Sequence, residues 1–273
     1  MGDFIVKGLR KTYGDFSLEI PELVFRRGFV TGVVGDNGAG KTTLMRCMTG
    51  AALPEEGSVD PGSPLPAGAV FDECPFPQEM RARQLSSIFS SMFDGWDDQR
   101  FRGMLKSFGI DEGKKVKEYS RGMRMKAQVA VALSHPTGIL VLDEPTAGMD
   151  PAAREEFLDC IRDYMLDESS CVAISSHITS DIEKIADYLV FLKDGKVIID
   201  GETSEILSRY GVLHAPRDSD ICGSGIVRRR TGPHGCDYLV EGLEEFSAAH
   251  PELKADPVTL EELMILISKG EEA

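Results

Sequence analysis

Short apolar runs alternate with expected helices along most of the chain. Residues 29–34, 138–142 and 171–176 are mostly apolar and too short for typical helices. Runs of this kind are typical of strands that a parallel sheet buries on both faces. Helices are expected at 121–133, after a capping residue, and at 151–165, where a proline opens the helix. This alternation favours an α/β fold.

The segments flanking this pattern predict further strands. Residues 4–20 predict two strands joined by a tight turn and ending before Pro21. Residues 188–199 predict a hairpin around an Asp-Gly turn. Thr179 or Ser180 is expected to cap the helix that precedes this hairpin.

The composition changes between residues 53 and 77. Prolines and glycines are frequent there, so long regular elements are not expected, apart from a short strand at 67–71. Apolar positions at helical spacing return over 79–93 and 97–108 and predict a small helical subdomain.

The last sixty residues show weaker patterns. Strands are expected at 225–230 and 237–240, and a final helix at 259–269. The three consecutive arginines at 228–230 are expected to form a solvated strand face. This part of the chain carries no recognisable chemistry.

The strand expected at 29–34 runs directly into a glycine-rich loop of the form G-x-x-x-x-G-K-[ST]. The loop consists of Gly35, Asp36, Asn37, Gly38, Ala39, Gly40, Lys41, Thr42 and Thr43. Its glycines let backbone N–H groups approach an anion, and the helix expected from Lys41 turns its positive end toward that anion. Lys41 is suited to β- and γ-phosphates, and the Thr42 hydroxyl is a hard oxygen ligand for Mg²⁺. The loop therefore predicts a nucleotide phosphate site.

Two adjacent carboxylates follow the apolar run at 138–142. Asp143 and Glu144 stand at the carboxyl end of a buried strand, which is where open parallel sheets bind ligands. Buried carboxylates need a compensating cation, so Asp143 is a candidate Mg²⁺ ligand and Glu144 a candidate to polarise an attacking water. The simpler alternative is a solvated strand end. His177 ends the strand at 171–176 in the equivalent place and is either structural or catalytic.

Two further residues allow two interpretations each. Ser120 precedes an expected helix, so it is either an ordinary N-cap or part of a second anion site with Gly122 and the nearby basic residues. Tyr13 lies about twenty residues before the phosphate loop and is either a turn aromatic or a platform for a base.

Composition limits the partners. The chain has 273 residues and a net charge of −15, which argues against broad binding to nucleic acid or to an anionic membrane surface. No apolar run is long enough for a membrane helix, and no signal peptide is recognisable at the start. The six scattered cysteines are expected to be reduced, mostly core residues, in a cytoplasmic protein.

Six motifs in a fixed order resemble the nucleotide-binding subunit of an ABC transporter, over roughly residues 3–205. They are Tyr13 and His177 with the segments 35–43, 119–123, 139–144 and 147–150. The resemblance implies a P-loop NTPase cassette with a mostly parallel core sheet, an antiparallel β subdomain and a helical subdomain at about 74–135. It implies a nucleotide-binding domain over residues 1–205 and a small α+β extension over 206–273.

The resemblance also implies roles. Ser120 and Gly122 would complete the ATP site of a second nucleotide-binding subunit, and Tyr13 would stack on adenine. Glu144 would orient water, while His177 and Lys41 would contact the γ-phosphate. The cofactors would be ATP and Mg²⁺, the partner an integral membrane permease, and the location the inner face of the cell membrane.

Two departures from the family pattern stand out. The usual signature Leu-Ser-Gly-Gly-Gln is Tyr-Ser-Arg-Gly-Met at 119–123, and acidic Asp72 takes the place of a glutamine, where it is a further candidate in the Mg²⁺ network. Both features are similar to single-cassette subunits of bacterial ABC-2-type exporters. The alternatives are a soluble ABC-type ATPase acting on a non-membrane partner, a phosphate-loop kinase and a regulatory binder that does not hydrolyse ATP.

Overall fold

The computed structural model describes residues 2–217, 219, 221, 223–233 and 235–272. The strands are β1 (Phe4–Tyr13), β2 (Phe16–Phe25), β3 (Val30–Val34), β4 (Glu56–Asp60), β5 (Ala67–Val70), β6 (Ile139–Asp143), β7 (Val172–Ser175), β8 (Tyr188–Lys193), β9 (Lys196–Glu202), β10 (Tyr210–Ala215), β11 (Ile226–Thr231), β12 (Cys236–Glu241), β13 (Ala255–Pro257) and β14 (Glu271–Glu272). The helices are α1 (Lys41–Met48), α2 (Ala82–Met92), α3 (Asp98–Ser107), α4 (Arg121–Ala132), α5 (Pro151–Tyr164), α6 (Thr179–Ile185), α7 (Thr203–Arg209), α8 (Leu243–Ala249) and α9 (Leu260–Lys269), with a short 3-10 helix at Val116–Glu118.

The central sheet has the order β4-β1-β2-β9-β8-β3-β7-β6-β5. Strands β8, β3, β7, β6 and β5 run parallel, whereas β1 pairs antiparallel with β2 and β4. The expected mostly parallel core with an antiparallel β subdomain is therefore confirmed.

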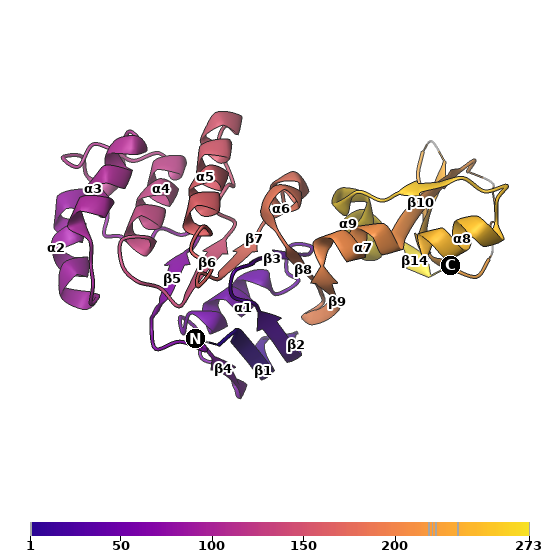
Figure 1. The fold of residues 1–273 in the computed structure, drawn as a ribbon, viewed down its shortest axis with the longest axis horizontal. Coiled ribbons are helices and arrows are strands. Elements are labelled where there is room, and N and C mark those ends of the chain that lie inside the picture. Colours follow the sequence, from indigo (N-terminus) through magenta and orange to yellow (C-terminus); the bar gives the residue numbers. More distant parts are fainter. Residues whose placement is uncertain (1, 218, 220, 222, 234, 273) are drawn as a thin grey trace.

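The parallel strands are continuous apolar runs because both of their faces are covered. Along β6, Leu140 and Leu142 face a core cluster with Phe157 of α5, while the alternate residues Ile139 and Val141 face a second cluster with Leu44 of α1. Figure 1 shows the sheet between these layers. This two-sided burial holds the carboxyl ends of the strands in one plane.

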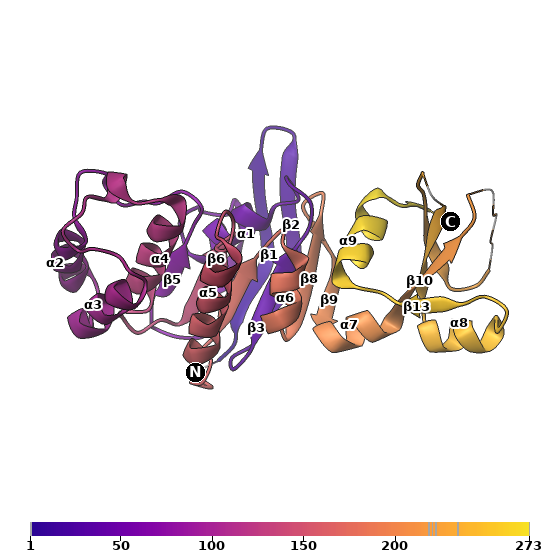
Figure 2. The ribbon, with the colours of Figure 1, turned by 90° about the horizontal axis from the view of Figure 1, so that it is seen from above.

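Two smaller units lie at opposite ends of the molecule (Figures 1 and 2). At one end, α2, α3 and α4 pack around a separate apolar cluster that includes Phe76, Leu85, Phe101 and Leu105. This confirms the expected helical subdomain.

At the other end, β13-β10-β12-β11-β14 form a second sheet with α7, α8 and α9. Helix α9 joins this extension to the cassette, because Leu260, Leu263 and Leu266 belong to the same cluster as the central sheet. The expected strands and final helix are present, whereas α7, β10, α8, β13 and β14 were not expected from the sequence.

Two expectations about local structure are wrong. Strand β2 continues through Pro21 to Phe25, because the register passes from Lys7–Glu22 to Leu9–Ile20 and leaves the proline unpaired. Helix α6 is not capped by Thr179 or Ser180: Thr179 is already its first residue.

The arginine run is not a simple solvated face. All three side chains are half-buried; Arg228 pairs with Glu272 at 3.4 Å and the Arg229 Nε donates to the Cys236 Sγ at 3.2 Å. Cys47, Cys74, Cys160, Cys171 and Cys236 are free thiols, and Cys222 lies outside the described residues. No helix in the described part of the chain combines the length and the apolar character that crossing a bilayer requires.

The turn between β8 and β9 forms a clamp, in that its backbone is hydrogen-bonded both to the phosphate loop and to β2. The Gly195 N–H donates to the Ala39 carbonyl at 3.1 Å, and the Glu19 N–H donates to the Gly195 carbonyl at 2.7 Å. Gly195 has φ +78°, and a Cβ there would lie 1.9 Å from the carbonyl oxygen of Ser17. Only glycine fits this contact.

Gly195→Ala should lower the stability of the protein by about 2 kcal/mol, or about 5 °C in Tm, because the clash is with backbone and the backbone conformation is left-handed. Gly103→Ala is the matched control: Gly103 lies inside α3 with open space around its Cβ position, so the change should raise stability by about 0.5–1 kcal/mol. Thermal unfolding followed by circular dichroism measures both. Equal Tm values for the two variants would contradict the clamp.

Candidate functional site

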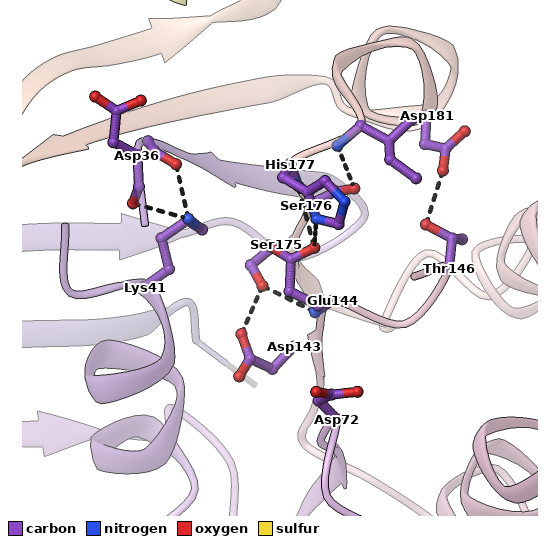
Figure 3. A network of polar contacts seen from close by, with 12 residues as sticks. Asp36, Lys41, Asp72, Asp143, Glu144, Thr146, Ser175, Ser176, His177 and Asp181 are labelled. Carbon is purple, nitrogen blue, oxygen red and sulfur yellow. Dashed lines mark hydrogen bonds and ion pairs between the residues drawn. The ribbon is translucent and has the colours of Figure 1, made fainter. Parts of the chain in front are cut away.

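The phosphate loop leaves the end of β3 and enters α1 as expected. Gly35 permits this path: its φ is +149°, and a Cβ would lie 2.2 Å from the carbonyl oxygen of Leu192. Lys41 is only 7% exposed, and its Nζ donates to the carbonyl oxygens of Gly35 at 2.7 Å and Asp36 at 3.1 Å. Figure 3 shows the lysine turned back over its own loop.

Burial lowers the pKa of Lys41, although nearby Glu144, Asp143 and Asp36 oppose the shift. The three carboxylates and the lysine therefore form one electrostatic cluster. A phosphate group that contacts Lys41 would meet a cation that is already desolvated, and such a cation interacts strongly because little water screens it.

Asp143 ends β6 and is 3% exposed. Its Oδ1 accepts a hydrogen bond from the Ser175 Oγ at 2.6 Å, and the same Oγ accepts from the Glu144 N–H at 3.0 Å. Ser175 stands beside Asp143 because β6 and β7 are parallel and in register at this pair. Ser175 was not singled out in the sequence; a polar residue closing a buried apolar strand was the available signal.

Glu144 and His177 are brought together as a pair (Figure 3). The Glu144 Oε2 accepts from the His177 backbone N–H at 3.1 Å and lies 2.6 Å from its Nδ1. Glu144 has φ +51°, a strained conformation for a residue with a side chain. That conformation turns the chain out of β6, and the side chain then reaches the loop that follows β7.

A buried network lies behind this pair. The Thr146 Oγ1 donates to the Asp181 Oδ2 at 2.7 Å, and the Arg154 Nε approaches the same oxygen at 3.7 Å. Asp181 is in the first turn of α6, and Thr146 lies in the turn after Glu144. The network ties the two loops together. Sequence reasoning missed it, since Asp181 lies 35 positions after Thr146 along the chain.

Ser120 and Gly122 are not part of this cluster. Ser120 is exposed at the N-terminus of α4, and its Oγ accepts from the Met123 N–H at 3.2 Å, which confirms that it caps the helix. Its role in an anion site stays a prediction. Among the residues that the structure describes, neither Ser120 nor Gly122 forms a hydrogen bond with the phosphate loop. Figure 1 shows α4 within the helical subdomain, with α2 and α3, and α1 apart from it beside the central strands.

Asp72 and Tyr13 lie at the edges of the site. Asp72 follows β5 and pairs with Arg121, whose Nε donates to the Asp72 Oδ1 at 3.1 Å. Tyr13 ends β1 and is half-exposed, with the Lys11 Nζ 5.3 Å from the centre of its ring. The Lys11 ammonium group therefore lies near the Tyr13 ring, and about half of the tyrosine remains exposed to solvent.

Known proteins match both the sequence and the fold. The ABC transporter family model matches residues 18–147. The lantibiotic transport ATP-binding protein SrtF of Streptococcus pyogenes is 29% identical over 212 residues, which cover 72% of this chain and 90% of SrtF. The tungstate uptake system ATP-binding protein TupC of Peptoclostridium acidaminophilum is 30% identical over 212 residues, 70% of this chain and 95% of TupC.

Among solved structures, the dimeric ATP-binding cassette MJ0796 in a post-hydrolysis state bound to ADP and Pi has a TM-score of 0.64 at 20% identity. The match covers 73% of this chain and 98% of that one, and at this identity it supports the fold alone. The matches to SrtF and TupC cover most of the length of each relative. With the family model, they show that the chain is an ATP-binding subunit of the ABC transporter family, and therefore an ATPase.

Proposed function

We propose that the chain works as a dimer that encloses two ATP molecules head to tail and drives a separate membrane permease, in the direction of export. The dimer rests on one observation. The N-terminus of α4, with Ser120 exposed at its cap, forms no hydrogen bond or ion pair with the Lys41 loop of its own chain in the described part of the structure. A phosphate site that uses both therefore needs a second copy.

The comparisons support this proposal in two ways. The cassette MJ0796, similar in fold, is dimeric and bound to ADP and Pi. The relative SrtF is a lantibiotic transport protein. Acidic Asp72 and the Ser-Arg-Gly-Met segment at 120–123 favour an ABC-2-type exporter, whereas the relative TupC belongs to an uptake system. The permease would contact residues 74–118 and would hold the chain at the inner face of the cell membrane.

Oxygen donors at the site fit a magnesium ion. Thr42 is exposed at the start of α1, and Asp143 presents a carboxylate that accepts a hydrogen bond from Ser175 on one oxygen, so both supply the hard oxygens that Mg²⁺ prefers. These two residues would hold the ion, with Asp72 as a third candidate. When bound, the ion supplies positive charge against the phosphates.

The chain's own residues would carry out the remaining steps of hydrolysis. Lys41 and the amides of residues 35–43 would bind the β- and γ-phosphates, and Tyr13 would stack on adenine. Glu144 would orient the attacking water, because its carboxylate is at the end of β6 and only partly exposed. His177 would contact the γ-phosphate and holds Glu144 in place through the 2.6 Å contact. The charge that develops would be stabilised by groups already positioned before the reaction.

Glu144→Gln should lower ATP turnover by about 100-fold or more, because the amide keeps the shape but cannot act as a base. ATP should then accumulate in a stable dimer, which light scattering detects. Glu22→Gln, in an exposed ion pair with Lys7, is the matched control and should turn over ATP normally. Normal turnover in Glu144→Gln would refute the role given to Glu144.

Ser120→Glu and Lys41→Ala should distinguish ATP binding by the monomer from formation of the dimer. In the Glu144→Gln background, Ser120→Glu should leave ATP binding to the monomer intact and abolish the dimer, because a carboxylate would repel the neighbour's phosphate. Lys41→Ala should abolish both. Fluorescent ATP binding and analytical ultracentrifugation measure the two properties. Loss of monomer binding in Ser120→Glu would place Ser120 in its own chain's site and contradict the head-to-tail dimer.

A further inference from the structure

Two of the positions at which this chain departs from the family pattern, Asp72 and Arg121, contact each other. The Arg121 guanidinium donates to one oxygen of Asp72 through its Nε at 3.1 Å and its Nη2 at 2.5 Å. The two residues are 49 positions apart and come from different elements: Asp72 follows β5, and Arg121 is the first residue of α4. Asp72, which stands where the family has glutamine, is thus paired with the cationic Arg121, which stands where the family has glycine.

The backbone around this pair is fixed. Gln128 is buried in α4, and its side chain holds both backbone groups of Phe71: the Phe71 N–H donates to Oε1 at 3.2 Å, and Nε2 donates to the Phe71 carbonyl at 3.0 Å. The residue before Asp72 is therefore held by two hydrogen bonds to the helix that starts with Arg121. Since the backbones are held, the side chains are the parts of this contact that can move.

The pair itself is weakly held. The Arg121 and Asp72 side chains are 52% and 53% exposed. Exposed pairs of this kind contribute little free energy, because water competes for both partners. A stronger anion close to Arg121 would therefore displace Asp72 easily.

Arg121 is placed to meet such an anion. It follows Ser120 directly, at the N-terminus of a twelve-residue helix whose first N–H groups lack partners within the helix. Its guanidinium also lies against the turn after Glu144: a Cβ on Gly148 would be 3.4 Å from the Arg121 Nη1. Arg121 thus borders both the surface that would face a second copy and the turn next to the base.

We propose that Arg121 is an additional phosphate-binding residue for the ATP of the partner subunit, and that Asp72 restrains it until that ATP arrives. The proposal rests on the head-to-tail dimer. The partner's γ-phosphate takes the guanidinium from Asp72, because a doubly charged group with three acceptor oxygens binds the planar fork of arginine better than one exposed carboxylate does. Asp72 follows β5, the strand paired with the β6 strand that ends at Asp143, and is then released toward its own site. Occupation of one site therefore prepares the other.

The restraint gives the two single variants opposite effects. In the Glu144→Gln background, Asp72→Asn should lower the ATP concentration needed for half-maximal dimer formation by about two- to five-fold, since the competing carboxylate is gone. Arg121→Gln should raise that concentration, and Arg121→Lys should fall between Arg121→Gln and the parent because it keeps the charge but not the fork. The double variant Asp72→Asn/Arg121→Gln should behave like Arg121→Gln, because Asp72 has no guanidinium left to restrain once Arg121 is replaced.

The control is Arg10→Gln, which breaks another exposed pair: the Arg10 Nη1 lies 3.1 Å from the Glu56 Oε1, with the side chains 49% and 64% exposed. It should leave the ATP dependence unchanged. Circular dichroism should show the same fold in all variants. Sedimentation against ATP concentration gives the measurement. If the parent forms the dimer and Asp72→Asn weakens it, or if the two single effects multiply in the double variant, the restraint is overturned while the dimer stands. A parent that never dimerises with ATP overturns both.

Discussion

The parallel alignment of β3, β7 and β6 is the constraint on which the site depends. Because both faces of these strands are buried, their positions along the sheet cannot slip without exposing one apolar layer or the other. Their carboxyl ends consequently meet at one edge, where Val34 leads into the phosphate loop, Asp143 stands beside Ser175, and His177 follows two residues later. The candidate site residues are thus brought together by the packing of apolar residues that take no part in the reaction.

Charge compensation explains much of the local geometry. Asp143 and Lys41 are both almost fully buried, and neither would be tolerated there alone. Ser175 satisfies the carboxylate and the loop carbonyls satisfy the ammonium group. Three carboxylates surround one lysine, so a polyphosphate could enter only with further positive charge. This imbalance fits a site that takes nucleotide together with a divalent cation.

Polar side chains join the loops around the site to one another and to the neighbouring helices. The Thr146–Asp181 bond ties the turn after Glu144 to α6, Gln128 ties the loop after β5 to α4, and Arg121 lies between the two. The surface pair of Arg121 with Asp72 is the least stable of these connections. A cassette with rigid loops and one exchangeable contact is suited to respond to a neighbour without unfolding any element.

The sequence by itself determined the strands and helices of the cassette and the identity of its phosphate loop. Periodicity and turn residues report burial and local geometry directly, so β3, α1, the helical subdomain and the Ser120 cap could be predicted from the residues in order. The ends of the predicted strands pointed to Asp143, Glu144 and His177 as candidates, and the family order of the motifs then implied their roles.

Only the tertiary structure decided which side chains meet. The Asp72–Arg121 pair, the Ser175 bridge and the Thr146–Asp181 bond join residues 30 or more positions apart, and no local pattern encodes such contacts. The path of β2 through Pro21 depended on the register of its neighbour, and the half-buried arginines of β11 depended on the strands and helix around them. Local interactions fix the elements, whereas partners across the fold are fixed by packing that the whole chain must complete.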